Sequence, residues 1–159
     1  MILNTLLGAL ILLCANIRET SQDSIIMLKQ KIEQNKIDKI EIYLIDWLTL
    51  TREAITPETL LKRYDIKMQV RKPYFNNAII HGWKESNILS TKLLDIRVGI
   101  LFYQKDRIIS RIYFGLSNEV IYFNGSSIKF DTDFVKAFWD YLPFSEREKI
   151  EKHFIKFVK

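Results

Sequence analysis

Two stretches of the chain alternate strictly between apolar and polar side chains, and this pattern constrains the fold most. In residues 66–71 (IKMQVR), Ile66, Met68 and Val70 alternate with two cations and a glutamine. Residues 94–102 alternate too, and the side chains expected to point inward are Leu94, Ile96, Val98, Ile100 and Phe102. Period-two alternation is typical of an antiparallel sheet with one covered face and one wet face.

Further strand signals surround these two stretches. Residues 39–46 (KIEIYLID) alternate, and residues 107–114 follow a polar turn at 104–106. Asn124-Gly125 separates two short apolar runs and predicts a hairpin, because both residues of such a turn need positive φ.

Helix signals lie between and after the strands. Ser24 is expected to cap a first helix, and residues 56–58 (Thr-Pro-Glu) have a cap, a first-turn proline and an acid. Apolar residues at helical spacing predict a helix over 75–83. Asp131 and Ser145 are expected to cap two C-terminal helices.

Strands in the middle of the chain with flanking helices indicate the α+β class. We expect one domain over residues 16–159, with a mostly antiparallel sheet of five or six strands. Helices are expected on one face of this sheet, together with the two C-terminal helices.

The first seventeen residues contain no charge, and residues 6–15 form an apolar run. This pattern predicts a signal peptide cleaved near Ala15 and export to the periplasm or the extracellular space. The alternatives are a membrane anchor through the same segment and a buried N-terminal helix.

The composition argues against several kinds of chemistry. The net charge is +5, and Cys14 is the only cysteine, so no cysteine metal site or thiol chemistry is expected. Five glycines leave no room for a phosphate loop, and His81 and His153 lack metal or triad spacing. We therefore predict no metal, no cofactor and no catalytic residue.

The loop after the first predicted strand is the most distinctive polar stretch. It contains Trp47, Thr51 and Arg52, and Trp and Arg are common interface anchors. These three residues are predicted to contact a partner, with Arg97 and Arg111 as charged neighbours if they share a sheet face. The competing interpretation is a loop in which Trp47 covers the edge of the core.

The order of elements resembles that of small bacterial immunity and inhibitor-type proteins. The matching segments are 45–52 with its Thr-Arg loop, Asp95-Ile96-Arg97, Tyr122–Gly125 and Tyr141-Leu142-Pro143, in outline from Lys39 to Pro143. The resemblance implies a non-enzymatic protein-binding role, with another protein as partner and no catalytic residues to transfer. The basic charge departs from what an inhibitor of nucleases would show.

Two other functions remain open. The first is a small exported hydrolase that uses carboxylates such as Asp46 with help from Arg52. The second is a module for single-stranded nucleic acid or anionic surfaces, because basic and aromatic residues interleave over residues 107–129. No specific nucleic acid is expected, and membrane contact is expected only through an uncleaved N-terminal segment.

Overall fold

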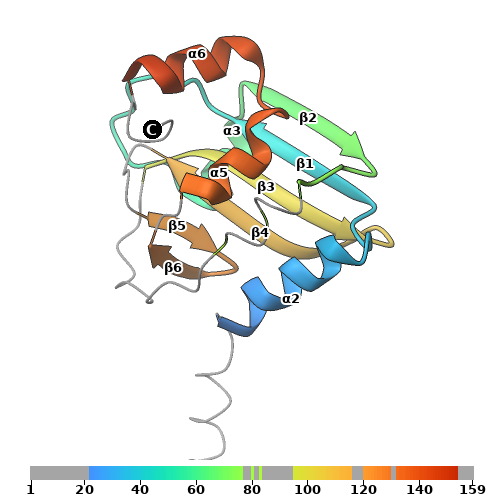
Figure 1. The fold of residues 1–159 in the computed structure, drawn as a ribbon. Helices are drawn as coiled ribbons and strands as arrows, with labels where there is room; N and C mark the ends of the chain where they lie inside the picture. The colour runs from blue at the N-terminus through green and yellow to red at the C-terminus, as the bar shows by residue number, and fades with distance from the viewer. Residues whose placement is uncertain are drawn as a thin grey trace, which may run out of the picture.

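The centre of the molecule is an antiparallel sheet of six strands in the order β2-β1-β3-β4-β5-β6 (Figure 1). The computed structural model describes residues 22–76, 80, 83, 95–115, 120–129 and 132–153. The strands are β1 (Lys39–Leu44), β2 (Ile66–Arg71), β3 (Ile96–Gln104), β4 (Arg107–Gly115), β5 (Val120–Phe123) and β6 (Ser126–Lys129). The helices are α2 (Gln22–Glu33), α3 (Pro57–Arg63), α5 (Thr132–Trp139) and α6 (Phe144–His153). The predicted α+β class and antiparallel sheet are confirmed.

The first face of the sheet, which contains Ile42, Ile100 and Ile112, carries the larger part of the core. Helices α2 and α5 lie over this face, on the near side in Figure 1. Their buried side chains include Leu28 and Phe138. The ring of Phe138 lies 5.7 Å from that of Phe102, centroid to centroid.

The second face, which contains Tyr43, Leu101 and Tyr113, is covered at one end by α3. Leu60 of α3 is fully buried there. Figure 1 shows α3 behind the sheet, opposite α2 and α5. The expectation that helices pack on one face only is therefore not confirmed. The alternation of apolar and polar residues could not predict helices on both faces. In β1, the side chains on both faces of the strand are buried from Ile40 to Leu44.

The strand predicted over residues 94–102 changes face at Arg97. The register shifts between Ile96, which pairs with Gly115, and Val98, which pairs with Phe114. Ile96 consequently belongs to the core cluster of the second face, and Val98 to that of the first face. The prediction that both point the same way is wrong, because an extra residue reverses the alternation.

Two local signals act as the sequence predicts. The Thr56 side chain caps α3 by accepting a hydrogen bond from the Thr59 amide, at 3.2 Å. Asn124 and Gly125 have φ values of 44° and 94° and join β5 to β6.

Two predicted caps are wrong. Ser24 lies inside α2, because that helix already includes Gln22. Ser145 lies inside α6, which begins at Phe144, and the Pro143 carbonyl accepts hydrogen bonds from the Glu146 and Arg147 amides. In both cases the helix extends past the side chain that was expected to cap it.

Several predictions fall wholly or partly outside the described residues. They are the N-terminal segment 1–17, Leu94, His81, the cap at Asp131 and most of the helix over 75–83. In that last stretch, the Ile80 amide donates to the Asn76 carbonyl, as in a helical turn. None of the helices that the structure describes has the length and apolar character needed to cross a membrane.

Candidate functional site

The five predicted contact residues lie in three different environments. Trp47 and Arg97 are buried, with exposed fractions of 3% and 1%. Thr51 and Arg52 are exposed in the loop between β1 and α3, and Arg111 is exposed on β4. Trp47 packs in the first-face core, with its ring 6.4 Å from that of Phe114. This position matches the competing interpretation of Trp47.

Arg97 is a buried cation paired within the fold. Its Nη2 atom donates to Asp95 Oδ2 at 2.7 Å, and Asp95 Oδ1 accepts from the Ile55 amide at 2.9 Å. This arrangement connects β3 to the segment that leads into α3. Because the Arg97 guanidinium is enclosed, it offers no surface to a partner.

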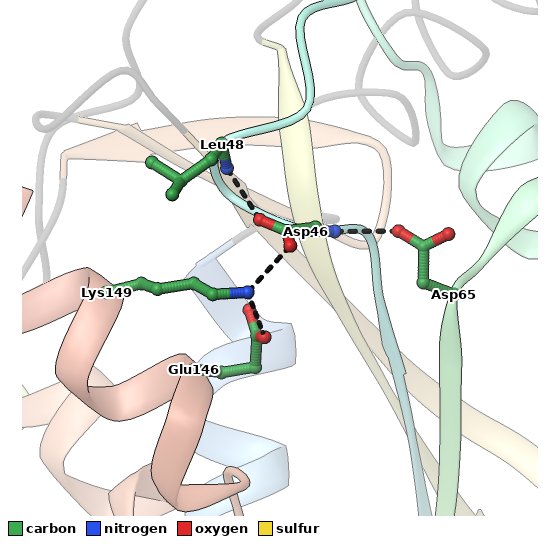
Figure 2. A network of polar contacts seen from close by, with 5 residues as sticks. All are labelled: Asp46, Leu48, Asp65, Glu146 and Lys149. Atoms are coloured by element: carbon green, nitrogen blue, oxygen red, sulfur yellow. Dashed lines mark hydrogen bonds and ion pairs between the residues drawn. The ribbon is translucent and has the colours of Figure 1, made fainter.

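Asp46, the carboxylate considered for hydrolysis, lies in a polar network that joins α6 to the end of β1 (Figure 2). Asp46 Oδ1 accepts from the Leu48 amide at 2.8 Å, and Oδ2 accepts from Lys149 Nζ at 2.6 Å. Lys149 Nζ also donates to Glu146 Oε1, and the Asp46 amide donates to Asp65 Oδ2. The carboxylate thus serves to hold α6 against the loop.

The same contacts determine the ionisation of Asp46. The hydrogen bond from Lys149, followed by that from the Leu48 amide, lowers the pKa of Asp46. The hydrogen bond to Asp46 in turn raises the pKa of Lys149. Both groups are therefore charged at neutral pH, as an ion pair requires.

An open cavity of about 620 Å³ lies beside Arg52, between the loop 51–55 and α3. Asp46 does not line it; the lining residues are Thr51, Arg52, Glu53, Ala54, Ile55, Thr59, Lys62 and Arg63. Among the described residues, the cavity beside Arg52 thus does not include Asp46.

The strongest polar cluster of the described residues lies on the second face, around Glu41. Its Oε2 atom accepts hydrogen bonds from the hydroxyls of Tyr43 at 2.7 Å and Tyr103 at 2.9 Å. Lys39 Nζ lies 3.1 Å from Oε1, and Lys67 Nζ lies 3.4 Å from Oε2. Three strands supply these residues, and their register brings them together.

This cluster stabilises the charged form of Glu41. Burial raises the pKa of Glu41, but hydrogen bonds from Tyr43, Tyr103 and Lys39 outweigh it, and the pKa falls to about 2. Burial, and then the hydrogen bond to Glu41, raise the pKa of Tyr103. The Lys39 ammonium lies 3.9 Å from the centre of the Tyr103 ring, a favourable cation–π distance.

Beyond the cluster, the second face presents further cations. Arg71 on β2 and Arg111 on β4 are exposed, and neither forms an ion pair within the described ranges. A groove of about 310 Å³ runs between α3 and β4, and Arg111, Tyr113 and Tyr122 line it. This groove combines aromatic walls with the Arg111 cation and the Glu58 carboxylate of α3.

Sequence reasoning missed the cluster around Glu41. The alternation over residues 39–46 already places Lys39, Glu41 and Tyr43 on one face of the strand. The other two members, Lys67 and Tyr103, come from strands whose register no local pattern specifies.

The described residues contain no group of three or more His, Cys, Asp or Glu side chains that could hold a metal ion. Comparison with protein-family models, with curated proteins and with solved structures finds no match to this chain.

Proposed function

We propose that this chain is a non-enzymatic protein-binding domain whose partner presents acidic groups. One observation carries the proposal: the part of the second face beyond α3 combines tyrosines with two exposed cations, Arg71 and Arg111, that form no ion pair among the described residues. Tyr and Arg are enriched at protein interfaces, where they combine contact area with directional hydrogen bonds.

The charge balance on this face supports an acidic partner. Its strands carry four cations, Lys39, Lys67, Arg71 and Arg111, and one carboxylate, Glu41, which is engaged by two hydroxyls and two ammonium groups. Helix α3 adds a second carboxylate, Glu58, in the groove beside Arg111, so cations outnumber carboxylates on this surface. Rim charges of one sign attract a partner of the opposite sign and raise its association rate.

Of the exposed members of the predicted contact set, only Arg111 lies on the proposed surface itself. Thr51 and Arg52 lie beside α3, which packs on the second face, and Arg111 lies on the face itself. For Trp47 and Arg97 we propose a supporting role, in which they hold the loop and the strand beneath the surface.

More narrowly, we propose an inhibitor of the immunity type that acts outside the cytoplasm. The order of elements resembles such proteins, and the uncharged N-terminal segment follows the pattern of an export signal. The basic surface suits a target with acidic groups. It suits a nuclease less well, because the basic active site of a nuclease attracts acidic side chains.

Affinity capture from the native host tests the proposal with three forms of the full chain. The first is the unaltered chain, and the second is Arg71→Glu combined with Arg111→Glu. The third, Lys36→Glu with Arg107→Glu, is the control, since it changes the net charge equally at exposed positions outside the second-face surface.

We expect one stoichiometric protein partner on the unaltered chain and on the control, and at least a tenfold weaker association for Arg71→Glu/Arg111→Glu. Equal capture by all three forms would place the interface elsewhere. A purified chain that turns over a substrate, or that binds a single-stranded oligonucleotide more tightly than any protein, would contradict the proposed function.

A further inference from the structure

Strand β2 forms one edge of the sheet, and β1 is its only neighbour in the sheet order. In Figure 1 no described helix or strand lies outside the half of β2 that ends in its arrowhead, whereas α6 lies near the other end of the strand. An edge strand of six residues presents backbone donors and acceptors that a further strand can pair with.

The ends of the β1–β2 ladder show which groups face outward. The Lys72 amide donates to the Asp38 carbonyl, and the Asp65 amide donates to the Leu44 carbonyl. The even-numbered residues of β1 therefore face β2, and their register partners Ile66, Met68 and Val70 face β1. The residues between these partners direct their N–H and C=O groups away from the sheet, and they are Lys67, Gln69 and Arg71.

The side chains of β2 form two stripes along this edge. Ile66, Met68 and Val70 are half-buried and pack against the first-face core. Lys67, Gln69 and Arg71 are exposed on the second face. A strand added at this edge would therefore extend an apolar layer on one side and meet two cations on the other.

The charges argue against a second copy of this chain as the added strand. Two copies can pair their β2 strands antiparallel with the second faces of both sheets on the same side. If Gln69 lies opposite Gln69 of the other copy, Lys67 lies opposite Arg71 of that copy. Centred on Met68, the pairing still gathers four cations on one face; it also places Arg71 opposite Asp65 of the other copy, but the Asp65 carboxylate already accepts a hydrogen bond from the Asp46 amide. Like charges directly opposite each other destabilise a strand pair, whereas acidic side chains at alternate positions would be attracted.

We propose that β2 accepts an extended segment of the partner as a seventh strand. The segment alternates acidic side chains, which face Lys67 and Arg71, with apolar side chains, which continue the layer of Met68 and Val70. Main-chain hydrogen bonds supply affinity in this mode of recognition, and the alternate side chains supply specificity. This inference rests on the proposed function and specifies how the partner binds.

The test uses the full chain and three synthetic peptides of one length. The first has the sequence EVEVEVE, the second replaces each glutamate by glutamine, and the third is the acidic peptide with alternate backbone amides methylated. Amide hydrogen exchange and NMR chemical shifts are measured residue by residue with each peptide.

The acidic peptide is expected to slow exchange at Lys67, Gln69 and Arg71 at least tenfold, because their amides point outward in the free chain. The amides of Met68 and Val70, already bonded to β1, should change little. The glutamine peptide should bind at least tenfold more weakly, and the methylated peptide should give no protection.

Gln69→Pro removes an outward N–H without removing a bond to β1, and Gln69→Thr is its matched control. Thermal unfolding confirms that both variants are folded. We expect Gln69→Pro to lose the peptide and Gln69→Thr to retain it.

Three outcomes would overturn the inference. They are no protection of β2 at millimolar acidic peptide, self-association of the chain through β2, and a Gln69→Pro variant that binds the captured native partner as the unaltered chain does. The last outcome would leave the proposed function intact, whereas the absence of any partner would remove the proposed function itself.

Discussion

At the scale of single residues, Glu41 organises the second face. One carboxylate accepts from two tyrosine hydroxyls and lies within ion-pair distance of two lysines. Buried charges persist only where such partners replace water. The lysines next to Glu41 are therefore held near fixed positions on the second face, which suits a surface that recognises a partner.

Replacing this carboxylate should destabilise the fold. Glu41→Gln keeps the shape but weakens the acceptor for Tyr43 and Tyr103, so we expect a loss of about 2 kcal/mol in the free energy of unfolding. Urea denaturation at pH 7 measures the loss. Glu148→Gln, at an exposed position in α6, is the control and should change the free energy by less than about 0.5 kcal/mol.

The same group predicts a dependence of stability on acid. Because folding lowers the pKa of Glu41 from an ordinary 4.5 to about 2, its contribution is complete above pH 4.5 and is lost as the pH falls towards 2. In urea denaturation from pH 6 to pH 2, the free energy of unfolding should fall less for Glu41→Gln than for the unaltered chain. Parallel curves for both proteins would contradict the assignment.

Gly115 is required by close backbone approach. A Cβ atom at this position would overlap the backbone carbonyl of Asp95, which cannot rotate away as a side chain can. Gly115→Ala should therefore cost at least about 2 kcal/mol of stability, measured by thermal unfolding. Gly99→Ala should cost less, because the atoms nearest to a Cβ atom there belong to the side chains of Leu60 and Tyr113.

At the scale of elements, α3 and α6 are attached in different ways. Helix α3 buries Leu60 on the second face, so its attachment is apolar. Helix α6 is joined to the end of β1 by the contact between Lys149 and Asp46. Among the described side chains of α6, this contact is weaker than burial of a leucine, and it depends on charge.

Removing the charge of Asp46 should loosen α6 without unfolding the sheet. Asp46→Asn is expected to speed amide exchange in α6 severalfold, which corresponds to at most about 1 kcal/mol for a partly exposed ion pair. Asp140→Asn is the control, because Asp140 is 95% exposed and lies 3.9 Å from Arg147. If the amides of α6 exchange at the same rate in both variants, Asp46 does not hold α6 against the loop.

At the scale of the whole molecule, the two faces of the sheet serve different purposes. The first face is covered by α2 and α5 and contains most of the core. The second face is covered by α3 at one end, and elsewhere it carries the cations that we assign to binding. Stability and binding should therefore respond to different substitutions.

This separation is testable with the variant proposed for affinity capture. Arg71→Glu/Arg111→Glu should change the free energy of unfolding by no more than about 0.5 kcal/mol, because both side chains are exposed and neither forms an ion pair in the described part of the chain. The same variant should lose the partner. A large loss of stability would show instead that these cations support the fold.

Local signals in the sequence account for much of the fold. The Thr56 cap, the Asn124-Gly125 turn and the alternation in residues 66–71 each depend on neighbours within a few positions. Their physical causes are side-chain capping, the preference of Asn and Gly for positive φ, and the alternation of apolar and polar side chains, and each can be recognised in a few neighbouring residues.

Tertiary structure alone decided the rest. The shift at Arg97, the burial of that guanidinium, the position of α3 on the second face and the cluster at Glu41 all depend on which strands become neighbours and in which register. Sliding a strand by one residue exchanges its two faces, and no local periodicity encodes that choice between distant segments. The sequence by itself thus determined the strands, the Thr56 cap and the Asn124-Gly125 turn, whereas strand register determined which charges are buried and which are exposed to a partner.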